Sequence, residues 1–148
     1  MATLKVKIQE DIVLSNQDYG SKRILEIASI DEVMKRIVTC AASQTTTIAV
    51  FNSNAYGAAG AVDIEDSKYI RITNLDRSNA VEVAVVGAAT LYQVNLAAGQ
   101  SHILGSADGL MLSEADTSPS FGTMADLGSI QVNPGGNAVD VELFIASA

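Results

Sequence analysis

Apolar and polar side chains alternate along most of this sequence, and this pattern constrains its fold more than any other feature. Leu4, Val6 and Ile8 alternate with Lys and Gln near the start, and residues 139–145 repeat the pattern near the end. Side chains two positions apart lie on the same face of a β-strand, so this period predicts strands with one wet face. Further strands are expected at 22–30, 36–41, 44–51, 69–75, 80–87, 91–96, 101–104 and 130–133.

Turn residues separate these segments about every ten residues, and no segment has a convincing helical period. Residues 31–36 are the one place where a short helix competes, and there we favour a turn that leads into the strand at 36–41. The strands at 69–75 and 80–87 are expected to pair as a hairpin. The pattern predicts one all-β domain over residues 1–148, an antiparallel β-sandwich of jelly-roll-like form with about 8–10 strands.

The composition supports a core without disulfides, metals or a membrane. Of the 148 residues 48% are hydrophobic, mostly Ala, Val, Ile and Leu, and the single Cys40 is expected to be a small buried side chain. The start of the chain has no apolar signal region, and no stretch approaches the ~18 apolar residues of a membrane helix. We therefore expect a protein that is made in a cytosol and has no membrane partner.

Charge is distributed unevenly along the chain. The net charge is -8, which argues against nucleic acid as a partner because phosphates are bound mainly by Lys and Arg. All nine basic residues lie between Lys5 and Arg77. One interpretation is an acidic, well-solvated surface. The other is a polarised molecule whose basic N-terminal strands meet an acidic neighbour, including another copy of itself.

The titratable residues form no recognisable catalytic or metal-binding motif. His102 is the only histidine, has no HxH or HxxxE spacing, and lacks a Gly-x-Ser-x-Gly elbow to pair with. Glu114 and Asp116 lie in a long loop and could bind Ca²⁺, but they lack the Asp-x-Asp-x-Asp-Gly pattern. We expect a protein that is not an enzyme and has no catalytic residues, cofactor or metal.

The segments Ile70–Leu75, Val81–Val83 and Val94–Ser101 carry a resemblance to a known group. A strand ending in Thr-Asn-Leu, a polar hairpin and a Leu-x-x-Gly-Gln-Ser turn resemble small virion proteins of tailed bacteriophages. In that group, jelly-roll-like modules decorate or cement the capsid or lie in the tail. Cupins share the turn, but this sequence lacks their clustered histidines and glutamate.

The resemblance implies a capsid decoration or cement protein that stabilises a phage head by binding its surface. It would be located in the virion, assembled in the host bacterial cytoplasm, and bound to the major capsid protein or another virion protein as a homo-oligomer, with a trimer favoured. The alternatives are a receptor- or glycan-binding module of a tail or baseplate, and a small hydrolase that uses His102 or paired acids. Candidate contact residues are Lys5, Lys7, Lys22, Arg23, Lys35, Arg36, Glu114, Asp116 and Phe121.

Overall fold

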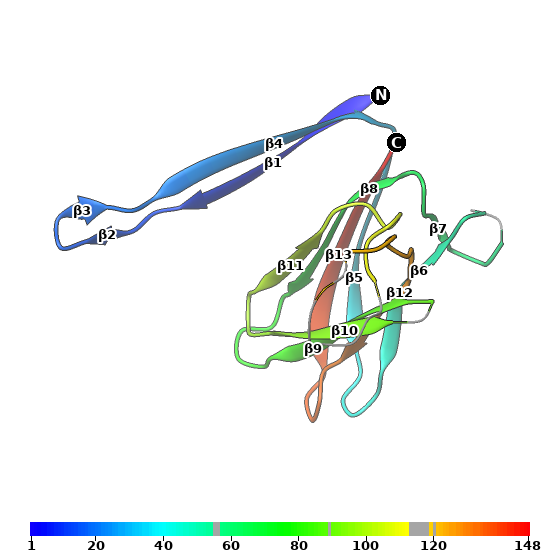
Figure 1. Ribbon diagram of the computed structural model, residues 1–148. Helices are drawn as coiled ribbons and strands as arrows, with labels where there is room; N and C mark the ends of the chain where they lie inside the picture. Colours follow the sequence, from blue (N-terminus) through cyan, green and yellow to red (C-terminus); the bar gives the residue numbers. More distant parts are fainter. Residues whose placement is uncertain (55–56, 89, 113–118, 120) are drawn as a thin grey trace.

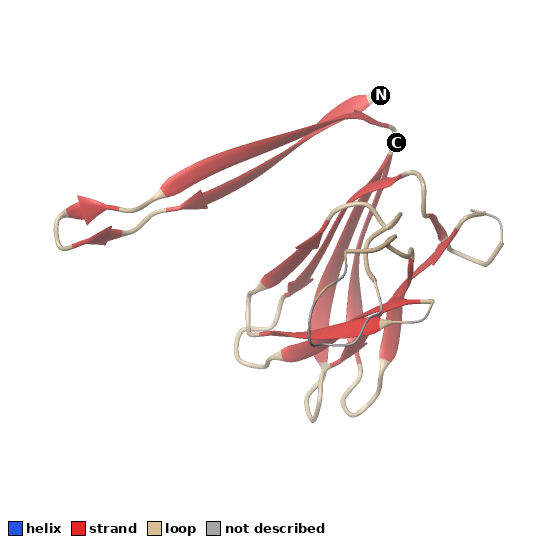
Figure 2. Ribbon diagram, in the orientation of Figure 1, coloured by secondary structure: helices blue, strands red, loops and turns tan. Residues whose placement is uncertain are grey.

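Two β-sheets packed face to face make up most of the molecule, and a long hairpin projects from one end of them (Figure 1). The computed structural model describes residues 1–54, 57–88, 90–112, 119 and 121–148, and among these it has strands and loops but no helix (Figure 2). The strands of the sandwich are β5 (Glu32–Cys40), β6 (Thr46–Asn52), β7 (Val62–Asp63), β8 (Ser67–Asn74), β9 (Val81–Gly87), β10 (Leu91–Leu96), β11 (Ser101–Leu104), β12 (Leu127–Asn133) and β13 (Val139–Ser147).

The order of these strands is that of a jelly roll. One sheet has the order β11-β8-β13-β5 and the other β10-β9-β12-β6-β7. Every pairing is antiparallel except that of β6 with the short β7. The chain crosses repeatedly between the sheets, as a double-sheet jelly roll requires. The predicted fold class, an all-β antiparallel sandwich of jelly-roll-like form, is confirmed.

Inward-facing side chains of both sheets form one continuous apolar core. Alternate residues of β8, β9 and β13 are completely or almost completely buried, as the period-2 pattern predicts. Cys40 is buried with them, and this burial raises the pKa of its thiol. The largest fully buried side chains are Ile48, Ile70, Ile72, Leu127, Ile130, Leu143, Ile145, Val81, Val83, Val85, Val132 and Val139.

Two local predictions are wrong. Residues 31–36 form neither a turn nor a helix, because β5 begins at Glu32 and pairs with β13 over its whole length. The strands at 69–75 and 80–87 do not pair as a hairpin, because β8 and β9 belong to opposite sheets. The short link between β8 and β9 crosses between the layers instead of reversing within one of them.

The first 30 residues lie outside both sheets. They form a two-stranded arm of β1 (Ala2–Glu10) and β4 (Ser21–Ile30), which ends in the small hairpin of β2 (Val13–Leu14) and β3 (Gln17–Asp18). At ~3.3 Å per residue β1 alone is about 30 Å long. The arm leaves the sandwich beside the end of β13 and points away from it (Figure 1). The predicted single sandwich therefore occupies residues 32–147, and the arm is an addition to it.

Candidate interaction surface

The arm has two chemically different faces, which its register defines. Residues paired across an antiparallel ladder lie on the same face. Leu4 pairs with Ile27 and Val6 with Leu25, so these four apolar side chains share one face. On the other face, the Nζ atom of Lys5 lies 2.9 Å from Oε1 of Glu26. The arm is thus an amphipathic ribbon with no second sheet of its own to cover its apolar face.

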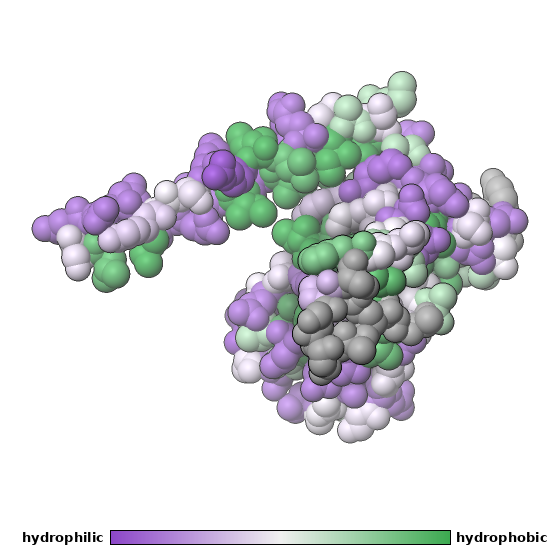
Figure 3. All heavy atoms as spheres, in the orientation of Figure 1, coloured by the Kyte–Doolittle hydropathy of each residue, from purple (hydrophilic) through white to green (hydrophobic). Residues whose placement is uncertain are grey.

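Apolar side chains are exposed along the arm to an unusual degree. Of the sixteen large apolar side chains that are exposed among the described residues, eight lie in the first 30 residues. Val13 is 71% exposed and Leu14 61%. Figure 3 shows apolar patches along the shaft of the arm, which is its β1–β4 part, and at its outer end. Concentrated exposure of this kind is typical of interaction surfaces, so the arm is the candidate site.

The outer end of the arm, residues 10–20, is called here the arm tip. Its two central turn residues, Ser15 and Asn16, have φ values of 52° and 62°, the pattern of a type I′ hairpin turn. Gly20 is required where β4 begins, because a Cβ atom there would lie 2.5 Å from the carbonyl oxygen of Glu10. The tip carries exposed apolar side chains together with carboxylates, namely Ile12, Val13, Leu14 and Tyr19 with Glu10, Asp11 and Asp18.

The base of the arm is anchored on the outer face of the four-stranded sheet. Ile30 is buried in a small cluster with Tyr69 of β8 and Ala146 of β13, against which Leu4 and other arm residues pack. The ring of Phe144 meets that of Tyr69 edge to face, with centroids 6.0 Å apart. The cluster fixes the first part of the arm to the body and leaves the rest projecting.

A groove runs between the arm and the outer face of this sheet, and it is called here the arm groove. It consists of two adjoining hollows of about 240 and 320 Å³ that share Val6, Ile8, Tyr69 and Ile103. Ile103 is 43% exposed at the β11 edge of the sheet. The shared walls are apolar, and this contrasts with the polar outer face of the other sheet, where the lining residues include Glu82, Gln93, Gln131 and Asn133.

The rim of the arm groove is basic although the protein as a whole is acidic. No Asp or Glu is among the described residues that line it. Its five cationic residues are Lys5, Lys7, Arg23, Lys68 and Arg71. Two of them are paired with acids just outside the lining, Lys5 with Glu26 and Arg71 with Glu142. More than half of the nine basic residues of the chain therefore gather in one place.

The predicted contact residues lie in different parts of the molecule. Lys5, Lys7 and Arg23 line the arm groove, and Lys22 lies beside them on the arm, paired with Gln9. Lys35 lies on the outer face of β5 with its Nζ atom 3.7 Å from Oε2 of Glu142.

Among the remaining predicted contacts, Arg36 and Phe121 line neither hollow of the arm groove. Arg36 is exposed and donates a hydrogen bond to the carbonyl oxygen of Ile48 in the opposite sheet, and its expected role as a partner contact stays a prediction. Glu114 and Asp116 lie outside the described residues. Phe121 is 81% exposed in the loop before β12.

The sequence prediction missed the apolar part of this surface. Ile24 belongs to a segment that was expected to be a strand like those of the core. The polar cluster at 15–20 indicated the turn, but it did not indicate that the strands on either side lack a covering sheet. A signal was available in the neighbouring apolar residues 12–14, which break the alternation next to a turn.

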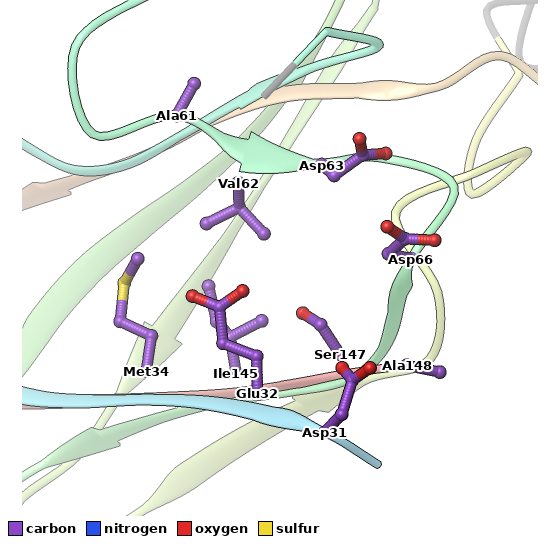
Figure 4. Close-up of a pocket in the computed structure, with 10 residues that line it drawn as sticks. All are labelled: Asp31, Glu32, Met34, Ala61, Val62, Asp63, Asp66, Ile145, Ser147 and Ala148. Atoms are coloured by element: carbon purple, nitrogen blue, oxygen red, sulfur yellow. The ribbon is translucent and has the colours of Figure 1, made fainter. Parts of the chain in front are cut away.

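A separate acidic pocket of about 350 Å³ lies between the start of β5, the end of β13 and the segment around β7. Asp31, Glu32, Asp63 and Asp66 line it, and Figure 4 shows that the Asp63 carboxylate points away from the side chains of Asp31 and Glu32. The chain therefore brings together acid pairs that are far apart in the sequence. The described residues contain no group of three or more His, Cys, Asp or Glu side chains placed to hold a metal ion.

His102 lies at the open edge of the sandwich. Its Nε2 atom is 3.1 Å from the hydroxyl of Tyr92, and the two rings meet edge to face. Burial lowers the pKa of His102 below its ordinary value. The contact joins β10 of one sheet to β11 of the other.

Comparison with known proteins identifies no relative by sequence. No family model matches the chain, and no curated protein matches it. A solved structure described as "Bacillus endospore appendages form a novel family of disulfide-linked pili" aligns with a TM-score of 0.44 and 12% identity, over 83% of this chain and 94% of that chain. Among the described residues there is also no helix that is long and apolar enough to span a membrane.

Proposed function

We propose that this protein is a structural subunit of a bacteriophage particle, a decoration or cement protein that binds the surface of the head. Its mechanism would be adhesion, in which contact surface buried between subunits stabilises the shell. The major capsid protein or another virion protein would be its partner, and the protein itself would be a homo-oligomer, with a trimer favoured.

The observation that carries this proposal is the arm. An isolated two-stranded hairpin is marginally stable in water at best, so a long arm with exposed Val13 and Leu14 needs a partner surface to cover it. A subunit of an assembly supplies such a surface when it meets its neighbours. The jelly-roll fold adds an argument by analogy, because this fold recurs in viral capsid domains.

The proposal is tested by locating the protein in purified particles of the phage that encodes it. Gold-labelled antibodies should decorate heads, and mass spectrometry of gradient-purified particles should find the protein in many copies. Particles made without it should release their DNA at a lower temperature than complete particles. Absence of the protein from purified particles would refute a virion role, and labelling of tails alone would favour the receptor- or glycan-binding alternative.

A further inference from the structure

We propose that the arm tip of one copy binds in the arm groove of a second copy of this chain. This inference deepens the proposed function and takes its biological setting from it, but it concerns the purified protein alone. It names the partner of the arm as another subunit, and it names the two surfaces that meet.

The apolar parts of the two surfaces match. The tip presents Val13 and Leu14, both more than half exposed. The groove presents Ile8, Leu25 and Ile103, which are also exposed and which lie around an apolar hollow. Seating the tip in the groove would remove both sets of side chains from water at once, and apolar area removed from water is the main driving force of association.

The charges of the two surfaces are opposite. The tip carries Glu10, Asp11 and Asp18 and has no basic residue. The groove is lined by five cations and no described acid, and Lys7, Arg23 and Lys68 are not among the two that form ion pairs with Glu26 and Glu142. The first 30 residues have four basic and four acidic residues, so the arm is neutral overall and its two halves are opposite in sign. Complementary charges of this kind set the register of an interface and exclude wrong partners.

The tip and the groove of one molecule cannot meet. The shaft of the arm forms one wall of the groove, because Val6, Ile8, Arg23 and Leu25 line it. The ladder from Leu4–Ile27 to Glu10–Ser21 continues without a break toward the tip and holds it away from the body. The tip therefore reaches a groove of the same chemistry only on a different copy.

The contact joins two different surfaces, so it is heterologous. Repeated heterologous contacts close into a ring when the rotation between subunits allows it, and otherwise they continue as an open chain. The expected trimer would be a ring of three such contacts. In either arrangement every tip and every groove is used, apart from those at the ends of an open chain.

A charge exchange tests the pairing directly. One variant reverses the tip (Glu10→Lys with Asp11→Lys), a second reverses the groove (Lys7→Glu with Arg23→Glu), and a third combines all four changes. Asp18 is left intact because its Oδ1 atom accepts a hydrogen bond from the backbone N–H of Gly20, whereas Glu10 and Asp11 accept only from the exposed side chains of Ser21 and Gln9. Glu82→Lys with Asp140→Lys is the matched control, because both residues are exposed acids outside the groove.

Sedimentation velocity over a range of concentrations should show association of the unmodified protein. The tip-reversed variant and the groove-reversed variant should each associate at least about tenfold more weakly, since like charges then meet across the interface. The combined variant should regain most of the affinity, and an equimolar mixture of the two half-reversed proteins should associate. The control should behave as the unmodified protein, and circular dichroism should show the same β structure in all of them.

Several results would overturn the inference. These are an unmodified protein that stays monomeric at its highest soluble concentration, association that ignores both half-reversals, and a combined variant as weak as its parents. An apolar test is independent of charge: Val13→Ser with Leu14→Ser should also weaken association at least about tenfold. Because none of these measurements involves a phage particle, their failure is distinct from failure of the virion role.

Discussion

Arg71 of β8 and Glu142 of β13 form an ion pair on the outer face of the four-stranded sheet, with Nη2 of the arginine 2.5 Å from Oε1 of the glutamate. The guanidinium also lies over the ring of Phe144, 5.8 Å from its centroid. Phe144 packs in the cluster that anchors the arm. The ion pair therefore fixes the position of a groove cation and supports the base of the arm.

Glu142→Gln is expected to lower the free energy of unfolding by about 1 kcal/mol at neutral pH, because the charged partner of Arg71 is lost in a largely shielded site. The hydrogen bond from Arg71 lowers the pKa of Glu142 below 4.5. A carboxyl group with a lowered pKa stabilises the folded state above its unfolded pKa, and this contribution is lost as the pH falls through the folded value. The difference between the two proteins, measured by urea denaturation, should therefore shrink below about pH 4. Glu82→Gln, on the exposed face of the other sheet, should show no such difference.

Asn74 is expected to be the most sensitive polar position of the sandwich. It is completely buried, its Nδ2 atom donates to the carbonyl oxygens of Asn79 and Leu96, and its Oδ1 atom accepts from the backbone of Asp76. Asn74→Ala would leave buried carbonyl groups without donors, at a cost of about 3 kcal/mol in the free energy of unfolding.

Chemical denaturation measures this loss, and Asn95→Ala on the exposed face of β10 is the matched control. Asn74→Asp tests the donor role, because a carboxylate in the same place would face two carbonyl oxygens. It should be at least as destabilising as Asn74→Ala. Equal stability of the Asn74 and Asn95 variants would show that the buried hydrogen bonds contribute little.

The same contacts explain the motif on which the resemblance to phage proteins depends. Asn74 meets Leu96, its backbone N–H donates to Gln100, and the hydroxyls of Thr73 and Ser101 lie 2.7 Å apart. The Thr-Asn-Leu strand end and the Gly-Gln-Ser turn thus close one corner of the sandwich. Their role here is to hold the fold, so they carry no information about a partner.

Alternation along the chain predicted which residues share a face, but it could not predict which strands pair. Local turn residues between β8 and β9 indicated a reversal, whereas burial against the second sheet places the two strands in different layers. The same limit applies to the arm. Ile24 and Ile72 occupy similar strand patterns, yet one is 53% exposed and the other is buried, because only the tertiary arrangement decides whether a second sheet covers them.

The charged part of the candidate surface could be predicted from the sequence, since Lys5, Lys7 and Arg23 are concentrated in the first strands. The direction in which a single side chain points could not be predicted in this way. Arg36 belongs to the same group in sequence, but its position in β5 directs its exposed side chain to the carbonyl oxygen of Ile48 in the opposite sheet. A change of one residue in strand parity separates Lys35, which pairs with Glu142 on the outer face of β5, from Arg36, which reaches the other sheet.

Ile30 and Ile24 are expected to differ strongly although both belong to β4. Ile30 is 4% exposed in the anchoring cluster, so Ile30→Ala should lower the free energy of unfolding by about 2–3 kcal/mol. Ile24 is exposed on the arm, and Ile24→Ala should change the free energy of unfolding by less than about 0.5 kcal/mol. Hydrogen exchange adds a local measurement, since arm amides should exchange faster in Ile30→Ala only. Similar effects of the two substitutions would contradict the anchoring role of Ile30.

His102 is expected to make the sandwich less stable as the pH falls below about 6.5. Burial lowers its pKa below 6.5 in the folded protein, so the unfolded chain binds the proton more readily. The free energy of unfolding therefore has its full value with respect to His102 above about pH 6.5, and it falls as the pH drops toward the folded pKa. The lowered carboxyl pKa values, those of Asp76 and Glu142, act only below 4.5.

Urea denaturation at about pH 7.5 and about pH 5.5 checks this dependence. His102→Gln should remove most of the difference between the two conditions, since His102 is the only histidine in the chain. Tyr92→Phe should keep the difference, because burial and not the tyrosine hydroxyl is the cause of the shift, but it should lose about 1 kcal/mol at both pH values with the hydrogen bond. If His102→Gln retains the full pH dependence of the unmodified protein, another group must bind the proton, and the edge of the sandwich is not where the chain senses pH.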